Sequence, residues 1–271
     1  MLLVSIFLVL ITIVAAVVQT ISFSRLCEYV ETELNRKRPS FQPRASVILP
    51  CKGLDPDFKD NITRLLNQDY PDFEVIFSVA DRSDPAYESL VELSKNAGGR
   101  AQIVVAGIDP RRAQKLNNQL CALKKACPRS EVLVFVDSDV IAGDDFLTNL
   151  IEPLADNTIG VTTGYRFYLS SPGNLPSILR SLWNRMSAWE MASNHAFAWG
   201  GAMAISRNVF EKAAVAQSWD RSCDDDLSLT TCIKAIGLSV HFVPRCLVAS
   251  KGDASFSEII EWTNRQLILT K

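Results

Sequence analysis

The sequence is poor in the residues that build zinc sites or surfaces for nucleic acid. It has two histidines, and its seven cysteines include no Cys-x-x-Cys pair, so no zinc ligand set of the usual spacing is present. Its 28 basic residues are balanced by 30 acidic ones, and we therefore expect no nucleic-acid partner. An odd number of cysteines without paired spacing fits free thiols in a reducing compartment.

Charged residues are absent from residues 1–24, which consist almost entirely of Leu, Ile, Val and Ala. This run is long enough to cross a bilayer, which takes about 20 residues. No Lys or Arg precedes it and no small-x-small cleavage site follows it, which favours an uncleaved membrane anchor over a signal peptide. Basic residues follow the run directly, at Arg25, Arg36, Lys37, Arg38 and Arg44. The positive-inside rule then places the rest of the chain in the cytoplasm.

From residue 45 onward, short runs rich in Val, Ile and Phe alternate with amphipathic segments. The expected strands are 45–50, 73–79, 102–105, 131–136, 159–165, 202–206 and 239–243. The expected helices are 57–67, 85–95, 114–125, 176–193 and 227–235. Alternation of this kind predicts an α/β fold, with a mainly parallel, Rossmann-like sheet covered by helices on both faces. Ligands bind such sheets at the carboxyl ends of the strands.

These patterns divide the chain into four parts. We expect an anchor over 1–24, a connector over 25–44, one catalytic domain over 45–255, and the start of a C-terminal interfacial helix over 256–271. The sequence stops inside that last helical pattern. We therefore expect it to be a fragment of a longer membrane protein with further spans.

The sharpest motif is a buried strand pattern that ends in two carboxylates. Asp137 and Asp139 follow the apolar run 132–136 and are separated by one residue. Such a pair can hold a hard divalent cation, Mn²⁺ or Mg²⁺, which neutralises a diphosphate as it leaves. The alternative is an ordinary solvated turn, because Asp is common where strands end.

A second acidic motif, Asp224–Asp226, opens a helical pattern. Crowded carboxylates raise one another's pKa, and a carboxylate poised in this way can take a proton from an attacking hydroxyl. Helix capping is the alternative, since Asp is favoured in the first turn of a helix. Upstream, Gly200 and Gly201 allow either a tight turn or the close approach of a ligand.

Weaker signals gather at other predicted strand ends. Lys52 follows the first strand and could meet a phosphate, and Asp81 follows the second and could accept hydrogen bonds from a base. Lys115 and Asn117 open a helix, and helix N-termini suit phosphate groups. Each has an ordinary explanation as a surface residue, but all are expected at one edge of the sheet. His241, in an apolar strand, is expected to be a packed core residue.

Together these motifs resemble the family 2-type and family 21-type glycosyltransferases of the GT-A fold, in particular the ceramide glucosyltransferase-like branch. The resemblance covers residues 45–271. It implies that Asp81 contacts the uracil side of the nucleotide and that Asp137 and Asp139 bind the metal. It also implies that Asp226 is the catalytic base; Asp225 and Asp224 are the reserve candidates. The other matching segments are VILPCKG with Lys52, QKLNN with Lys115 and Asn117, and WGGAMAISRNVFE with Gly200 and Gly201.

One segment departs from the family pattern. Where the family has Gln-x-x-Arg-Trp, residues 262–266 read Trp-Thr-Asn-Arg-Gln, and only Arg265 matches. In the family this segment helps to hold the acceptor and the diphosphate. The resemblance therefore implies the fold and the reaction class and leaves the acceptor open.

The resemblance implies inverting, metal-dependent transfer of a sugar from a nucleotide-sugar, expected to be a UDP-sugar. The membrane anchor keeps the site close to the bilayer, so we expect the acceptor to be a lipid hydroxyl at the cytoplasmic membrane face. A polysaccharide synthase is an alternative, although it is expected to keep the complete Gln-x-x-Arg-Trp segment. A polyprenyl-phosphate sugar transferase is another, and it needs no base of the Asp226 kind. An inactive binding protein of the same fold is a third.

Overall fold

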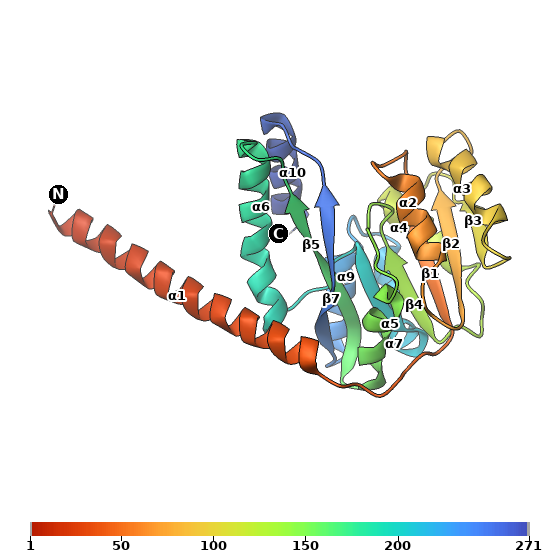
Figure 1. Ribbon diagram of the computed structural model, residues 1–271, viewed down its shortest axis with the longest axis horizontal. Coiled ribbons are helices and arrows are strands. Elements are labelled where there is room, and N and C mark those ends of the chain that lie inside the picture. The colour runs from red at the N-terminus through yellow and green to blue at the C-terminus, as the bar shows by residue number, and fades with distance from the viewer. Residues whose placement is uncertain (1, 270–271) are drawn as a thin grey trace.

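The computed structural model describes residues 2–269 and shows an α/β domain from which one long helix projects (Figure 1). The outermost residues of the expected anchor and of the segment 256–271, namely Met1, Thr270 and Lys271, lie outside the described residues. The helices are α1 (Leu2–Asn35), α2 (Phe58–Leu66), α3 (Pro85–Lys95), α4 (Gln114–Leu123), α5 (Phe146–Ile151), α6 (Leu175–Ala188), α7 (Arg207–Lys212), α8 (Val215–Trp219), α9 (Asp226–Ala235) and α10 (Phe256–Leu269). Short 3₁₀ turns follow α5 and α6 at Glu152–Ala155 and Trp189–Ala192.

Seven strands form one sheet in the order β3-β2-β1-β4-β6-β5-β7. They are β1 (Ala45–Pro50), β2 (Phe73–Val79), β3 (Ala101–Val105), β4 (Val132–Val136), β5 (Ile159–Leu169), β6 (Ala202–Ser206) and β7 (Ser239–Lys251). Only β6 runs antiparallel to both of its neighbours, β4 and β5. The predicted α/β class with a mainly parallel sheet is confirmed.

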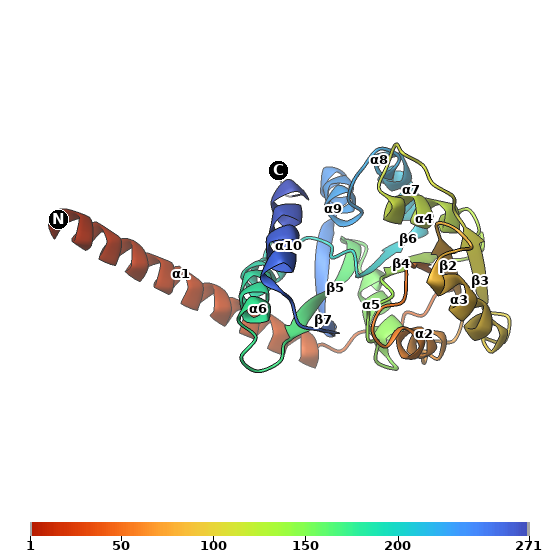
Figure 2. The same cartoon turned by 90° about the horizontal axis from the view of Figure 1, so that it is seen from above.

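The sheet is buried on both faces because its central strands are mostly apolar. In β1, Val47 and Leu49 belong to one core and Ile48 to the other, and all three are fully buried. Successive side chains on a strand point to opposite faces, so an unbroken apolar run serves two cores at once. Helices α2, α3 and α5 cover one face, and α4, α7, α8 and α9 cover the other (Figure 2).

The strands β5 and β7 are longer than the sequence predicted. Each continues beyond its apolar run, and the added segments pair with one another in parallel from Tyr165–Leu247 to Leu169–Lys251. Charged residues such as Arg166 and Arg245 interrupt the hydrophobic pattern there, so hydrophobicity alone ended the predicted strands early. The helices α5 and α8, of 6 and 5 residues, were missed because they are too short to show a helical period.

Helix α1 carries the expected membrane anchor and continues into the expected connector. Val4–Asn35 is long and apolar enough to cross a membrane. Its last turns pack on β7, where the Tyr29 hydroxyl donates to the Phe242 carbonyl at 2.6 Å. Glu33, whose side chain is 3% exposed, forms an ion pair with Arg38 and lies 3.1 Å from His241 Nε2. His241 therefore joins a charged cluster, rather than the apolar core we expected. The division into anchor, connector and catalytic domain stays a prediction.

Helices α6 and α10 stand side by side at the β7 edge of the sheet (Figures 1 and 2). Both expose large apolar side chains to solvent. On α6 these are Leu175, Ile178, Leu179, Leu182 and Trp183, and on α10 they are Phe256, Ile260, Leu267 and Ile268. The two helices thus present an apolar surface on the side of the domain from which α1 projects (Figure 1).

Candidate active site

A cavity of about 790 Å³ opens at the carboxyl ends of β1 and β4. One half is formed by the end of β1, the turn after β4 and the start of α4. The other half is formed by β5, α6 and α10, and the loops that precede β6 and α9 close the base. This is the edge of a parallel sheet at which ligands are expected.

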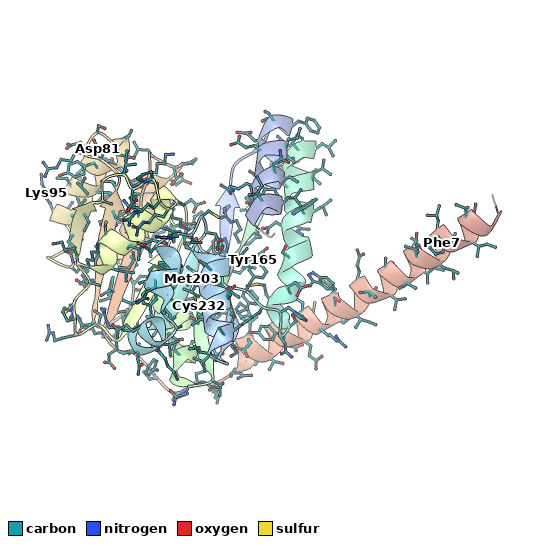
Figure 3. All side chains as sticks on the ribbon, turned by 180° about the vertical axis from the view of Figure 1, so that it is seen from behind. Phe7, Asp81, Lys95, Tyr165, Met203 and Cys232 are labelled. Atoms are coloured by element: carbon teal, nitrogen blue, oxygen red, sulfur yellow. The ribbon has the colours of Figure 1, made fainter. Side chains whose placement is uncertain are left out.

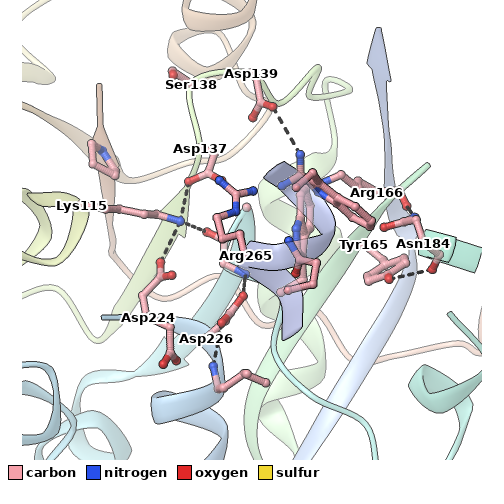
Figure 4. A pocket seen from close by; sticks show the side chains of 18 of the residues that line it. Lys115, Asp137, Ser138, Asp139, Tyr165, Arg166, Asn184, Asp224, Asp226 and Arg265 are labelled. Carbon is pink, nitrogen blue, oxygen red and sulfur yellow. Dashed lines mark hydrogen bonds and ion pairs between the residues drawn. The ribbon is translucent and has the colours of Figure 1, made fainter. Parts of the chain in front are cut away.

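Lys115 lines the cavity, and its ammonium contacts groups from three segments of the chain (Figure 4). Its Nζ is 2.8 Å from Asp137 Oδ1 and 2.9 Å from Asp225 Oδ2, and it donates to the Gly200 carbonyl at 3.1 Å. Burial on its own would lower the pKa of Lys115, but the two carboxylates outweigh it and raise the pKa above its usual range. The side chain is therefore a fixed positive charge.

The two aspartates after β4 both line the cavity, as the sequence predicted. Ser138, between them, also lines the cavity. Its hydroxyl donates to Asp55 at 2.7 Å and its carbonyl accepts from the Asn61 amide at 3.3 Å, and these two hydrogen bonds hold the turn that carries both carboxylates. Burial raises the pKa of Asp137, although Lys115 opposes the shift.

The donor set fits a hard divalent cation. Within residues 2–269 no group of three or more His, Cys, Asp or Glu side chains is arranged to hold a metal. Mg²⁺-type sites at phosphates commonly take one or two carboxylates from the protein and the remaining ligands from the phosphate and water. Asp137 and Asp139 supply such a pair, and the Lys115 ammonium beside Asp137 shows that this position accepts a cation.

The three carboxylates of Asp224–Asp226 have three different environments. Asp224 caps α9 by accepting from the Ser228 backbone N–H at 2.8 Å. Asp225 is buried and accepts from Gln119 Nε2 at 2.9 Å in addition to its pair with Lys115. Asp226 accepts only backbone N–H groups among the described contacts, from Gly200 at 3.2 Å and from Leu227 at 2.8 Å.

Asp226 has the titration behaviour expected of a general base near neutral pH. Burial, and then the neighbouring charge of Asp225, raise its pKa to about 6. It lines the cavity, and no side-chain cation pairs with it directly within the described residues. Of the three carboxylates, Asp226 is therefore the one available to accept a proton.

Gly200 and Gly201 lie so close to neighbouring side chains that there is no room for a Cβ at either position. A Cβ on Gly200 would lie 2.7 Å from Asp225 Oδ1 and 3.0 Å from Lys115 Nζ, and one on Gly201 would lie 2.2 Å from the Trp199 ring. Both distances to Asp225 and Trp199 are shorter than real contacts allow. The glycines thus let the loop before β6 pass directly under the Lys115–Asp225 pair.

The remaining residues predicted to bind the nucleotide-sugar divide into two groups. Lys52 and Arg265 line the cavity, and Arg265 extends toward its centre (Figure 4). Asp81 lies at the outer edge of the domain, away from Tyr165 (Figure 3), and its carboxylate accepts from the Ser83 backbone. The Asn117 amide donates to the Gly107 carbonyl at 2.9 Å and so holds the loop after β3. Neither Asp81 nor Asn117 is among the cavity-lining residues.

The half of the cavity next to α6 and α10 is aromatic. Its rings are Tyr165, Tyr168, Trp183, Phe197, Trp199 and Trp262. The charged residue Arg166 lies among them on β5. It was not identified from the sequence because it falls just beyond the predicted strand 159–165. A polar residue inside an aromatic run, as in Tyr165–Tyr168, is the signal that could have identified it.

A family model described as Glycosyl transferase family 21 matches residues 4–267. The chain belongs to this family. The predicted resemblance is confirmed, and the match extends through the helix that carries Arg265.

Two curated relatives of this family 21 chain are named N-acetylglucosaminyltransferase. The protein from Neorhizobium galegae is 28% identical over 142 residues, which cover 46% of this chain and 28% of the relative. The protein from Mesorhizobium japonicum is 26% identical over 123 residues, which cover 45% of this chain and 28% of the relative. The matched region thus spans less than a third of the length of either relative.

Solved structures show the same fold. A mannosyltransferase from Pyrobaculum calidifontis, in complex with GDP-Man and Mn²⁺, has a TM-score of 0.61 at 19% identity and covers 93% of this chain and 71% of its own. Glucosyl-3-phosphoglycerate synthase from Mycobacterium tuberculosis, in complex with Mn²⁺ and UDP-glucose, has a TM-score of 0.51 at 18% identity and covers 90% and 80%. Family 21 membership and the GT-A-like fold agree.

Proposed function

We propose that this chain is an inverting, metal-dependent glycosyltransferase that moves a sugar from a nucleotide-sugar to a lipid hydroxyl. The observation that carries this proposal is the arrangement around Lys115. A carboxylate pair suited to a cation, Asp137 and Asp139, lies on one side, and Asp226, with its pKa raised to about 6, lies near the other. A donor diphosphate and an acceptor hydroxyl need these two kinds of group within one cavity.

In the proposed reaction, Asp226 takes the proton of the acceptor hydroxyl as the acceptor oxygen attacks the anomeric carbon. The new bond forms on the face opposite the nucleotide, the bond from the anomeric carbon to the diphosphate oxygen breaks, and a nucleoside diphosphate leaves. Asp137 and Asp139 would hold the Mn²⁺ or Mg²⁺, which supplies positive charge to the leaving group. Lys115 and Arg265 add fixed positive charge from the protein.

A lipid acceptor is supported by the surroundings of the cavity. The exposed apolar residues of α6 and α10 flank its aromatic half, and α1 projects on the same side (Figure 1). An interfacial helix typically buries such a face at the boundary between headgroups and acyl chains. The basic residues that follow the apolar run favour a cytoplasmic location for the cavity.

The choice of donor sugar and nucleotide rests on the family resemblance and on the names of the similar proteins. We propose a UDP-sugar, with UDP-N-acetylglucosamine and UDP-glucose as the first donors to test and GDP-mannose as the third. A polyprenyl-phosphate acceptor needs no general base, so it predicts that Asp226 is dispensable. A polysaccharide synthase predicts a polymeric product.

The experiment is a transfer assay in membranes that contain the full chain, with these donors, Mn²⁺ or Mg²⁺, and extracted lipids. We expect a metal-dependent glycolipid, which mass spectrometry identifies. Asp226→Asn should abolish it, while Asp224→Asn, the matched change in the capping carboxylate, should retain most of it. Absence of product with every donor, or full activity of Asp226→Asn, would contradict the proposal.

A further inference from the structure

Arg166 is a charged residue in the aromatic half of the cavity with no assigned task. It lies on β5, its side chain is 22% exposed, and its guanidinium carbon is 5.0 Å from the Trp199 ring centroid and 5.8 Å from that of Tyr168. Such ring contacts hold a guanidinium in place and leave its edge free to donate hydrogen bonds. Figure 4 shows this edge directed toward Asp139.

The contacts of Arg166 leave most of its hydrogen-bonding capacity unused. Its ion pair with Asp139 spans 3.7 Å, which is longer than a hydrogen bond. Among the described residues no hydrogen bond is donated by this guanidinium, although it has five N–H groups. A largely buried charge without a close counterion is unfavourable, and a cation bound by Asp139 would weaken even this one contact.

We propose that Arg166 binds a phosphate-type oxyanion of a substrate inside the cavity. The inference rests on the proposed function and deepens it, because it assigns a second charged subsite beside the metal carboxylates. Arg presents two parallel N–H groups that match the geometry of a phosphate. The oxyanion belongs either to the diphosphate of the donor or to a phosphate group on the acceptor lipid, and the two sources are separable by experiment.

Arg180 provides a matched control. Its guanidinium carbon lies 4.2 Å from the centroid of the same Tyr168 ring, and it donates to the Gly252 carbonyl at 2.7 Å. It is not among the residues that line the cavity. Replacing Arg180 therefore removes a stacked guanidinium from Tyr168 without removing a charge from the substrate side.

The test measures binding by the full chain in detergent, using the fluorescence of the cavity tryptophans. The probes are UDP with Mn²⁺ for the donor diphosphate and glycerol 3-phosphate for a lipid phosphate, with glycerol as the neutral control. Arg166→Met should weaken at least one phosphate probe about 10-fold or more, as expected for a lost charged hydrogen bond. Arg166→Lys should restore part of the loss, and Arg180→Met should change neither affinity.

Each outcome decides the proposal. Weaker UDP binding assigns the oxyanion to the donor, weaker glycerol 3-phosphate binding with unchanged UDP binding assigns it to the acceptor, and weakening of both assigns a shared subsite. Unchanged affinities in a folded Arg166→Met protein would overturn it, as would a change confined to Mn²⁺ affinity, which would mean that Arg166 acts only through Asp139. Failure of the wild-type chain to bind UDP with Mn²⁺ would instead count against the proposed function.

Discussion

Lys115 and Asp225 form an ion pair of 2.9 Å that joins the first turn of α4 to the residue before α9. The same ammonium lies 2.8 Å from Asp137, at the end of β4. One positive charge thus holds together three segments that are far apart in the sequence. Asp226, next to Asp225, is positioned by this link, so the proposed base and the proposed metal carboxylates depend on Lys115 for their relative placement.

Removal of the Lys115 charge should destabilise the protein. In Lys115→Met, Asp137 and Asp225 would face one another without their counterion. Breaking a buried pair in this way costs about 3–5 kcal/mol, and we expect the lower end, ~3 kcal/mol, since the Lys115 side chain is 34% exposed. Denaturant unfolding in metal-free buffer measures the loss.

The surface pair Lys59–Glu92 supplies the control for this change. Both of its side chains are more than half exposed, at 58% and 65%. Exposed pairs contribute about 0–1 kcal/mol, so Lys59→Met should unfold almost like wild type. Equal stabilities of Lys115→Met and Lys59→Met would show that Lys115 does not hold the site together.

The pH dependence of activity should report Asp226. A general base works in its ionised form, and the pKa of Asp226 is raised to about 6. Activity should therefore fall as the pH drops through about 6 and level off above 7. In Asp226→Asn, transfer should fall about 10²–10⁴-fold, and the residual activity should lack the acidic limb. A rate profile from pH 4.5 to 8.5 for both proteins makes the comparison.

The raised pKa of Asp226 should make stability fall over the pH range in which activity rises. A carboxyl whose pKa is higher in the folded than in the unfolded protein binds protons more tightly when folded, so its ionisation destabilises the fold as the pH rises from about 4 to above 6. Asp226→Asn should then be more stable than wild type at pH 7.5, with the difference shrinking toward pH 4. A variant less stable than wild type at pH 7.5 would mean that Asp226 is a structural residue.

Gly200→Ala should inactivate the protein without unfolding it. The added Cβ would lie 2.7 Å from Asp225 Oδ1, so either the loop or the Lys115–Asp225 pair must shift. A displacement of about 1 Å at a catalytic group can cost ~10²-fold in rate. Gly143→Ala is the control, because its Cβ would meet Asp145 at an ordinary 3.5 Å. A rate of transfer near that of wild type in Gly200→Ala would show that the close packing of Gly200 against Asp225 is not needed for activity.

The contact of α1 with the domain should affect membrane-dependent transfer. Glu33 is almost fully buried, forms ion pairs with Arg36 and Arg38, and lies 3.1 Å from His241 Nε2. Glu33→Gln leaves the two arginines without their carboxylate, so α1 should detach more readily from β7. We expect transfer to membrane lipids to fall more than donor hydrolysis. Glu31→Gln, on the exposed side of α1, should alter neither rate.

The sequence predicted the strand ends better than it predicted which side chains meet there. Asp137 and Asp139 were identifiable because they follow an unbroken apolar strand. The resemblance predicted Asp226 as the base with Asp225 in reserve, and that assignment stays a prediction. What the sequence did not predict is that Lys115 pairs with Asp225, while Asp226 accepts only backbone N–H groups among the described contacts. Arg166 was missed because the extension of β5 depends on pairing with β7, which leaves no mark in a local hydrophobic pattern.

Asp81 and Asn117 show that the position of a residue at the end of a strand or the start of a helix does not by itself predict that its side chain lines the cavity. Asp81 follows β2 as predicted, yet β2 lies two strands from β4 in the sheet, and Asp81 is not among the cavity-lining residues. Asn117 lies two residues beyond Lys115 on α4, and its side chain turns toward the loop after β3. Their proposed contacts with a nucleotide stay predictions.

The stereochemistry of the product tests the central claim most directly. The full chain, a UDP-sugar of known α configuration, a divalent cation and the lipid acceptor found in the membrane assay would be combined, and the anomeric configuration of the early product read by NMR. Direct attack on the anomeric carbon with Asp226 as base predicts a β-linked product, formed by wild type and lost in Asp226→Asn. An α-linked product, or one formed equally well by Asp226→Asn, would contradict the account.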